Sequence, residues 1–338
     1  MRIIVDAFGG DNAPLSVIAG ARLAKDEQDV DIILVGDTDK ITACAEENKL
    51  SLDGIELMHA PEVFKMSDDP GEIIKSKKDS SMAVALLALA NGEGDAFVSA
   101  GSTGAVVVGS TFLVKRIKGV KRAALATFLP TDTGNYLLLD VGANAECRPE
   151  MLQQFGIMGS CYLENACGTA NPRVGLINIG TEEKKGGQLQ LDSYKLLKDA
   201  PINFIGNVEA RELNSGGCDV AVADGFTGNI VLKLTEGVAS TLMGMIKGIF
   251  KENFKTKLAA AMVMPGLKKM AKRMDYASVG GAPLMGISKP VIKAHGSSNA
   301  LAISNAIAQA DSFAKTDVIG KITVGLSQIK ESENSEIS

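Results

Sequence analysis

Several residue types are scarce in this chain of 338 residues, and each scarcity excludes a class of site. There is no Trp, aromatic residues make up 4%, and the only histidines are His59 and His295. These two histidines lack the spacing of metal-ligand pairs, so we expect no metal site. The five cysteines are an odd number without a CxxC pair, which favours reduced thiols over disulfides or a zinc site.

Long apolar runs and an excess of positive charge are also missing. No apolar stretch approaches the ~20 residues needed to span a bilayer, and the N-terminal MRIIVDAFGG is typical of a first strand rather than a signal peptide. Lys and Arg number 35 against 40 Asp and Glu, a net charge of −5, which argues against nucleic acid as the main partner. Because 46% of the residues are hydrophobic, the chain can bury a large core. The reduced thiols and the missing signal peptide favour a cytoplasmic protein.

The common motifs of nucleotide enzymes and serine hydrolases do not occur. The sequence contains neither GxGxxG, nor GxxxxGK[ST], nor GxSxG. A dinucleotide or P-loop site therefore has no direct support, and we expect no cofactor.

One pattern recurs along the chain: an apolar run, then a loop of small polar residues, then the start of a helix. In residues 136–150 (YLLLDVGANAECRPE), a buried strand carries Asp140 near its end, and Pro149 is placed to open a helix. The same pattern occurs in IIVDAFGGDNAP, DAFVSAGSTGAVVVG, VGLINIGTEEKKGG, VAVADGFTGN and VIKAHGSSNA. It predicts an open α/β sheet whose loops gather at the carboxyl ends of the strands. Small residues and helix N-termini there favour a phosphate or carboxylate ligand.

The expected strands follow from the apolar runs. They cover residues 3–5, 32–35, 55–59, 96–99, 124–129, 137–141, 174–179, 204–208 and 220–223. The short TDTGN between two of them predicts a hairpin of 124–129 with 137–141. A long helix is expected after Asn229 and a last one at 300–314, whereas the polar end 331–338 is expected to fray.

Seven motifs in order resemble one family. DAFGGDNAP, SAGSTGA, LLLDVGANAECRPEML, PRVGLINIGTEEKKG, FIGNVEAREL, DGFTGN and PVIKAHGSSNA are similar to the PlsX-type phosphate acyltransferases of bacterial phospholipid synthesis, from Met1 to about Ala314. The chain departs from that family's usual pattern at Asn12, where His is usual, and at Gly187, where KGN has become KGG. The chain therefore lacks the imidazole that the family usually has at position 12.

The resemblance implies both a fold and a reaction. The fold is a three-layer α/β/α, Rossmann-like, mostly parallel sheet related to the phosphate acetyltransferase and isocitrate dehydrogenase-like fold, in one catalytic domain at 1–330. The implied reaction moves a long acyl group from acyl carrier protein to inorganic phosphate and gives acyl phosphate. The family also implies a homodimer and an enzyme peripherally associated with the inner face of the cell membrane.

This chemistry needs an anion site, a donor for the tetrahedral oxyanion, and alignment of the reactants, because a thiolate leaves without obligatory protonation. The expected catalytic residues are Lys185, Asn229 and, with a milder role, Lys184. From charge alone, the two lysines would be expected in a solvated surface turn beside Glu182 and Glu183. Asn229 has the alternative role of helix cap.

Loop residues are the expected substrate contacts. They are Gly101, Ser102, Thr103, Gly104, Asn144, Asp224, His295 and Ser297. The alternative for His295 is a hydrogen-bonded imidazole in the core. For Asp140 and Asp224 we favour hydrogen bonds to loop amides over general-base roles. Cys147 as a nucleophile is disfavoured, because the family reaction needs no thiol.

Residues 245–275 depart from the sheet pattern. They hold eight basic and two acidic residues around the uncharged stretch 258–267, LAAAMVMPGL. This predicts a helical protrusion at 240–276 whose basic collar and apolar tip suit an anionic membrane surface or the acidic face of a carrier protein. A helical hairpin packed in a dimer is the alternative.

The sequence thus predicts a phosphate acyltransferase that uses acyl carrier protein. Three alternatives stay open: a phosphate acetyl- or butyryltransferase that uses coenzyme A, an NAD-dependent dehydrogenase of related fold, and a noncatalytic scaffold on a lipid surface.

Overall fold

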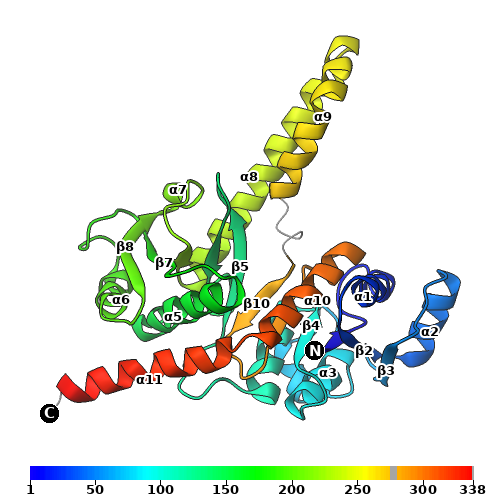
Figure 1. The fold of residues 1–338 in the computed structure, drawn as a ribbon, viewed down its shortest axis with the longest axis horizontal. Helices are drawn as coiled ribbons and strands as arrows, with labels where there is room; N and C mark the ends of the chain where they lie inside the picture. The colour runs from blue at the N-terminus through cyan, green and yellow to red at the C-terminus, as the bar shows by residue number, and fades with distance from the viewer. Residues whose placement is uncertain (275–279, 337–338) are drawn as a thin grey trace.

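One large sheet organises the structure, a computed structural model that describes residues 1–274 and 280–336. Its 11 strands lie in the order β3-β2-β1-β4-β11-β10-β5-β6-β9-β7-β8 (Figure 1). The strands are β1 (Arg2–Asp6), β2 (Asp31–Gly36), β3 (Ile55–His59), β4 (Ala96–Ser99), β5 (Ala124–Pro130), β6 (Asn135–Leu139), β7 (Arg173–Asn178), β8 (Asn203–Glu209), β9 (Val220–Val222), β10 (Ala282–Met285) and β11 (Val291–Lys293). All nine expected strands are present. The two strands outside these nine ranges are β10 and β11, which have only four and three residues.

The two halves of the sheet run in opposite directions. Strands β3, β2, β1, β4 and β11 are mutually parallel, and so are β6, β9, β7 and β8. Between them, β10 is antiparallel to β11 and to β5, and β5 pairs with β6 as the expected hairpin. Three reversals therefore separate β11 from β6. The loops after the strands of the first half therefore leave at one end of the strands, and those of the second half leave at the opposite end.

Helices cover both faces of the sheet, because side chains on a strand alternate between its faces. On β1, Ile3 and Val5 join the core shared with α1, α5 and α10, whereas Ile4 joins the core shared with α3 and α4. The result is the expected three-layer α/β/α arrangement. The helices are α1 (Leu15–Glu27), α2 (Thr38–Glu47), α3 (Ser81–Ala90), α4 (Thr103–Gly109), α5 (Pro149–Ala166), α6 (Gln188–Lys198), α7 (Ala210–Leu213), α8 (Gly225–Lys251), α9 (Phe254–Met274), α10 (Ala300–Lys315) and α11 (Val318–Glu336), with a 3-10 turn at Pro70–Ile74 and a π turn at Ser110–Val114.

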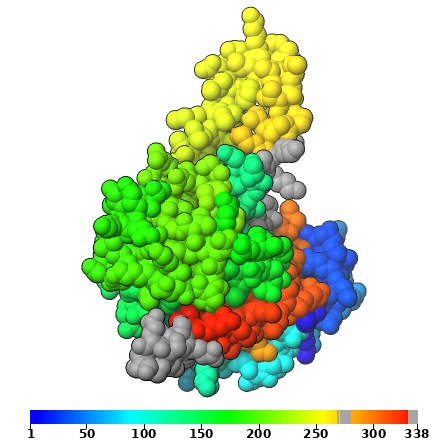
Figure 2. All heavy atoms as spheres, turned by 60° about the vertical axis from the view of Figure 1, so that its left-hand side comes forward, coloured from blue at the N-terminus to red at the C-terminus, as the bar shows by residue number. Residues whose placement is uncertain are grey.

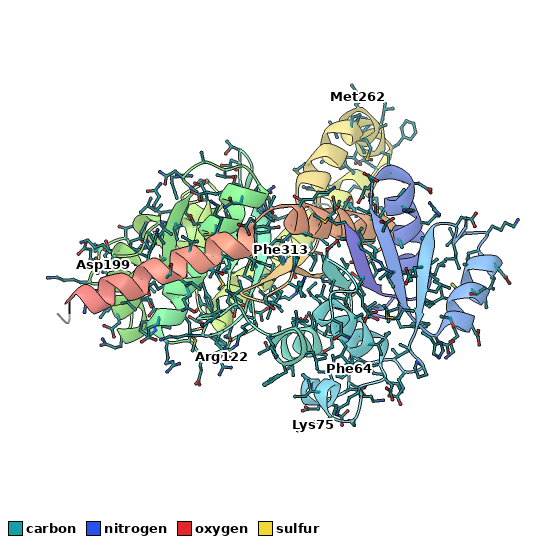
Figure 3. All side chains as sticks on the ribbon, turned by 60° about the horizontal axis from the view of Figure 1, so that its bottom comes forward. Phe64, Lys75, Arg122, Asp199, Met262 and Phe313 are labelled. Atoms are coloured by element: carbon teal, nitrogen blue, oxygen red, sulfur yellow. The ribbon has the colours of Figure 1, made fainter. Side chains whose placement is uncertain are left out.

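The C-terminal helices join the two halves. The ring of Phe313 on α10 packs edge-on against Tyr162 of α5, with ring centroids 5.2 Å apart (Figure 3). Helix α11 then packs on α5 and lies across the surface of the molecule (Figure 2). Residues 331–336, which were expected to fray, continue this helix, and 337–338 lie outside the described residues.

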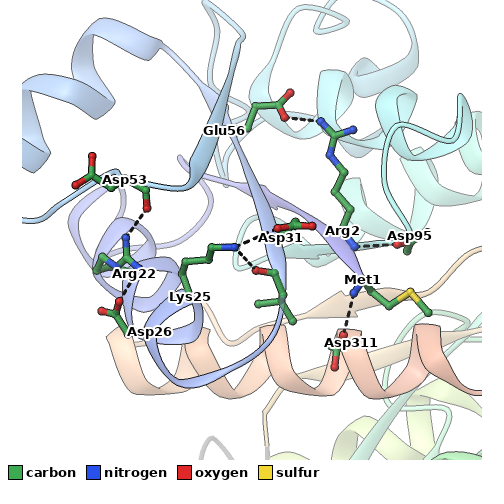
Figure 4. Close-up of polar contacts among 11 residues, drawn as sticks. Met1, Arg2, Arg22, Lys25, Asp26, Asp31, Asp53, Glu56, Asp95 and Asp311 are labelled. Atoms are coloured by element: carbon green, nitrogen blue, oxygen red, sulfur yellow. Dashed lines mark hydrogen bonds and ion pairs between the residues drawn. The ribbon is translucent and has the colours of Figure 1, made fainter.

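Polar contacts hold the first strand to its surroundings (Figure 4). The Met1 amino group lies 3.6 Å from a carboxylate oxygen of Asp311 on α10. The backbone N–H of Arg2 donates to Asp95 at 2.8 Å, and its guanidinium pairs with Glu56 on β3. These contacts fix the strand that leads into the first loop of the site.

Helices α8 and α9 form a hairpin that projects from the body (Figures 1 and 2). Its turn lies at Glu252 and Asn253, where Asn253 caps α9 by accepting from the N–H of Thr256 at 3.0 Å. The apolar stretch 258–267, predicted to form the tip, instead lies within α9. The expected protrusion at 240–276 is helical as far as Met274, and 275–276 lie outside the described residues. Among the helices that the structure describes, none combines the length and apolar character needed to cross a bilayer.

Candidate active site

A cleft of about 300 Å³ lies over the central antiparallel strands. Its floor includes Leu125 and Thr127 of β5 and Ala282 of β10, and its walls come from loops of both halves of the sheet. The polar side chains in its lining are Thr103, Thr127, Asn229, Lys233, Glu236, Lys293 and His295. The cleft therefore gathers three of the predicted site residues, Thr103, Asn229 and His295, on the face of the sheet.

The loop after β6 is built around the buried carboxylate of Asp140. One oxygen accepts from the N–H groups of Leu125 at 2.9 Å and Ala143 at 3.1 Å. The other accepts from the N–H of Asn144 at 2.7 Å and from its side-chain amide at 2.9 Å. Burial raises the pKa of Asp140, and these hydrogen bonds oppose that rise. Asp140 is thus a structural acceptor, as favoured from the sequence.

Asn144 serves the same loop. Its side-chain amide donates to the carbonyl of Ala123 at 2.7 Å in addition to Asp140. Its carbonyl accepts from the N–H of Gly225 at 2.8 Å, so the loop is joined to the first turn of α8. Asn144 does not line the cleft. In the structure it orders the cleft wall and is not placed as a substrate contact.

Helix α8 approaches this loop so closely that its first turns require glycine. A Cβ on Gly228 would lie 1.9 Å from the carbonyl oxygen of Asp140, and one on Gly225 would lie 2.4 Å from that of Asn144. Real side chains do not fit such gaps, which explains the glycines of DGFTGN. The close approach brings the exposed Asn229 beside Gly142, whose φ is +124°.

Asp224, not Asn229, caps helix α8. Its carboxylate accepts from the N–H of Thr227 and from the hydroxyl of Thr227, each at 2.8 Å. Asn229 lies in the second turn, and its side chain has no hydrogen-bond partner among residues 1–274 and 280–336. The alternative role of Asn229 as the cap is therefore wrong. Asp224, expected at the substrate, is placed as a capping residue.

The GSTG loop lies between β4 and α4. Ser102 caps α4, with its hydroxyl 3.5 Å from the N–H of Ala105, and the N–H of Gly101 donates to Ser99 at 3.0 Å. A Cβ on Gly104 would clash with Pro70 at 2.6 Å. Among these four residues only Thr103 lines the cleft. The other three hold the loop in place.

His295 and Ser297 form the loop after β11. The hydroxyl of Ser297 lies 2.8 Å from Nδ1 of His295, and the N–H of Ser297 donates to the same nitrogen at 3.2 Å. Nδ1 thus accepts, so Nε2 carries the proton in the neutral ring. Burial lowers the pKa of His295 and favours that neutral form. Asn12 ties this loop to the first one by donating to the carbonyls of Ser297 at 3.1 Å and Ser298 at 3.3 Å.

The sequence reasoning missed four polar residues of the cleft, Thr127, Lys233, Glu236 and Lys293, of which Lys293 is the buried cation. Lys293 is 7% exposed and lines the cleft, although it belongs to a strand. Its Nζ donates to the carbonyls of Ala100, at 3.3 Å, and Ala294. The available signal was a lysine inside the otherwise apolar run PVIKA. A charged side chain is almost never fully buried in a strand without a reason.

Lys184 and Lys185 do not line the cleft. Both are exposed, and Nζ of Lys185 lies 4.0 Å from Glu182. Their loop follows β7, two strands from β6, and is held by Asn178, which donates to the carbonyl of Lys185 at 3.0 Å. Within one chain the structure does not bring these lysines to Asn229.

Cys147 has the environment of a protonated thiol. Burial raises its pKa to about 11, and its Sγ lies 3.7 Å from the carbonyl of Asn144, to which the thiol donates. A thiol with this pKa holds little thiolate at neutral pH, and thiolate is the nucleophilic form. The residues that the structure describes also contain no cluster of side chains able to hold a metal ion.

Comparison with known proteins identifies the family. The model of the family described as "Fatty acid synthesis protein" matches residues 1–321. The phosphate acyltransferase of Thermoanaerobacterium thermosaccharolyticum is 47% identical over 322 residues, covering 95% of this chain and 96% of that protein. The chain belongs to the phosphate acyltransferase family. The phosphate acyltransferase of Bacillus licheniformis is 48% identical over 305 residues, covering 90% of this chain and 91% of that protein. The residues that line the cleft all fall within the 1–321 that the family model matches.

Solved structures extend the likeness in fold beyond the phosphate acyltransferase family. The EutD phosphotransacetylase from Staphylococcus aureus has a TM-score of 0.63 at 17% identity, covering 93% of this chain and 94% of that one. The 4-hydroxythreonine-4-phosphate dehydrogenase from Klebsiella pneumoniae has a TM-score of 0.55 at 12% identity, covering 93% and 99%. At these identities the likeness concerns the fold alone. It confirms the expected fold class of the chain.

Proposed function

We propose that the chain transfers an acyl group from a thioester to inorganic phosphate and forms acyl phosphate. The observation that carries the proposal is the composition of the cleft: one buried cation, Lys293, lies beside the neutral donors Thr103, His295 and Asn229. Such a lining suits an anion and a developing oxyanion. Membership of the phosphate acyltransferase family supports the same reaction.

The reaction needs no covalent intermediate on the enzyme. A phosphate oxygen attacks the thioester carbonyl carbon, the C–O bond forms, and the tetrahedral oxyanion collapses as the C–S bond breaks. The thiolate leaves and takes a proton from solvent. We propose that the Asn229 amide donates to the oxyanion and that the cleft holds phosphate in line with the carbonyl.

Trapping the product tests the proposal. The protein is mixed with palmitoyl carrier protein and phosphate, and hydroxylamine converts any acyl phosphate into a hydroxamate. We expect phosphate-dependent hydroxamate above a control without enzyme. A parallel reaction with acetyl or butyryl coenzyme A tests the short-chain alternative. Absence of hydroxamate with every donor would refute acyl transfer to phosphate.

Lys185 and Lys184 are retained as proposed phosphate contacts from the sequence pattern. Their exposure and the pair with Glu182 fit the solvated turn equally well. The proposal requires their loop to reach bound substrate, for example a carrier protein seated over the cleft. Phosphate kinetics of the alanine variants decide between these roles.

We propose that the donor carries a long chain, because an apolar groove of about 410 Å³ lies between α8 and α9. Met243 and Phe250 line the groove, whereas Asn229 and Glu236 line the cleft. These four are spaced by seven residues, so they share one face of α8. The groove begins roughly 10 Å beyond Glu236 along the helix axis, which places it where a chain leaving the cleft would run.

Chain-length dependence tests the role of this groove. Ile246→Asp puts a charge into the groove and should reduce kcat/KM for palmitoyl donors more than for butyryl donors. Thr241→Asp, on an exposed part of the same helix, is the matched control. Equal losses with both chain lengths in Ile246→Asp would argue against an acyl-chain groove.

The hairpin is the proposed contact with an anionic membrane surface and with acyl carrier protein. Phe254, Leu258 and Met262 recur every four residues on α9, and Phe254 and Met262 are 81% and 80% exposed (Figure 3). Lys251 and Lys255 lie beside them, also exposed. Apolar anchors flanked by lysines suit anionic lipid. Met262→Glu should reduce sedimentation with phosphatidylglycerol vesicles, and unchanged sedimentation would contradict this role.

We propose a homodimer through the outer face of α8. Seven exposed apolar side chains follow one another every three or four residues there: Phe226, Ile230, Leu234, Val238, Leu242, Met245 and Ile249. A contiguous apolar face of this kind marks an interaction surface. Light scattering coupled to size exclusion should give twice the chain mass for the parent and a monomer for Leu234→Asp. A monomeric parent protein would refute the dimer.

A further inference from the structure

Lys293 carries a buried charge that has no ion-pair partner among the residues the structure describes. The residue is only 7% exposed to solvent, and its Nζ donates to the carbonyls of Ala100 and Ala294. Carbonyl acceptors satisfy N–H groups but do not neutralise an ammonium. No carboxylate in residues 1–274 or 280–336 forms an ion pair with this Nζ, although buried charges are normally paired.

The nearest buried acid is already used elsewhere. The Asp6 carboxylate accepts from the hydroxyl of Ser81 at 2.6 Å, from that of Ser99 at 2.7 Å, and from the N–H of Phe8 at 3.3 Å. These bonds hold Asp6 behind the loops, on the side of α3. Burial raises the pKa of Asp6, whereas burial lowers the pKa of Lys293 to about 8, with Asp6 and Asp11 opposing that fall. Within residues 1–274 and 280–336 the ammonium thus has no ion-pair partner, and it lines the cleft.

We propose that Lys293 is the cationic centre of an oxyanion-binding subsite in the cleft, and that tetrahedral anions of the phosphate and sulfate class bind against its Nζ. Thr103 and His295 line the same cleft and can supply neutral donors. That the anion is substrate phosphate rests on the proposed function. The subsite itself does not.

Anion binding at this lysine has a thermodynamic signature. A bound dianion stabilises the charged amine and raises its pKa, so binding near pH 8 takes up protons. With a free-state pKa of about 8, roughly half of the molecules carry a neutral Lys293 at pH 8 and uptake approaches about half a proton per site. If Lys293 serves only to hydrogen-bond the carbonyls of Ala100 and Ala294, anion binding is not accompanied by proton uptake.

Sulfate is the probe, because it does not titrate in this range whereas phosphate does. Titration calorimetry at pH 8, in two buffers of different ionisation enthalpy and at fixed ionic strength, yields the proton uptake. The other titratable groups that line the cleft are Lys233, Glu236 and His295, and the charges of Asp6 and Asp11 also act on Lys293. His295 is the one that anion binding could also protonate, so His295→Gln is measured in parallel and should retain the uptake.

Three variants separate charge from fold. Lys293→Met should bind sulfate at least about tenfold more weakly, or about 1.4 kcal/mol, and show no uptake. Lys293→Arg should retain binding yet show no uptake, because guanidinium stays protonated. Lys40→Met removes an exposed lysine of α2 that pairs with Asp37, and this variant should match the parent in sulfate affinity and proton uptake.

Absence of proton uptake in the parent, or unchanged sulfate affinity in a folded Lys293→Met, would overturn the subsite. If Lys293→Met does not fold, the parent and Lys293→Arg titrations still decide. If sulfate binds through Lys293 but the hydroxylamine assay detects no acyl phosphate, the subsite is supported and the proposed reaction is refuted.

Discussion

Replacement of Asn229 by Ala separates catalysis from stability at the cleft. The side chain is exposed, lines the cleft beside Gly142, and has no hydrogen-bond partner among the described residues, so its loss removes little that holds the fold. We expect a change of no more than about 0.5 kcal/mol in the free energy of unfolding. Unfolding entropy near the midpoint is about 0.7 kcal/mol per kelvin for a chain of 338 residues. The melting temperature should therefore shift by less than about 1 °C.

The catalytic effect is expected to be far larger. An amide that donates only to the developing oxyanion stabilises the transition state and leaves the neutral thioester almost untouched. Losing one such donor costs about 2.7 to 4 kcal/mol, or roughly 10² to 10³ in kcat. Asn229→Asp should be no better, because a carboxylate repels both phosphate and oxyanion. Hydroxamate formation under saturating substrate measures kcat, and calorimetry measures the melting temperature.

Asp224→Ala is the matched control for stability on the same helix. Its carboxylate caps α8 through Thr227, so its loss should lower the free energy of unfolding by about 0.5 to 2 kcal/mol and the melting temperature by roughly 1 to 3 °C.

If Asn229→Ala instead keeps normal turnover, the oxyanion donors are backbone amides of the GSTG loop (101–104) or the GSSN loop (296–299). The role proposed for the Asn229 side chain would then be refuted.

Three further predictions concern other residues. Lys185→Ala should raise KM for phosphate and lower turnover, with Lys184→Ala milder; phosphate kinetics equal to the parent's in both would leave the pair as a solvated turn beside Glu182. Cys147→Ser should stay active, since burial raises the pKa of that thiol to about 11 and it donates to Asn144; an inactive but folded variant would point to a covalent intermediate. Activity should also survive treatment with chelators, and inhibition reversed by added metal would disprove the metal-free reaction.

The sequence alone determined the local elements and the family. Strand β4 lies at 96–99 as predicted, β3 at 55–59, and α10 at Ala300–Lys315 close to the expected helix. Apolar periodicity and the glycines between elements are enough for this, because they reflect contacts between near neighbours in the chain. The motif order was also enough to identify the phosphate acyltransferase family, which the relatives at 47% and 48% identity confirm.

Only the tertiary structure decided which of these elements meet. Strand β9 lies next to β6, so helix α8, which follows β9, brings Asn229 to the cleft. Strand β7 lies one position farther from the central strands, and Lys185, which follows it, does not line the cleft. The pairing of β11 with β4 and β10 buries Lys293 beside the loops at 101–104 and 296–299. No local pattern carries this information, because strand direction and burial depend on pairing between segments far apart in the chain.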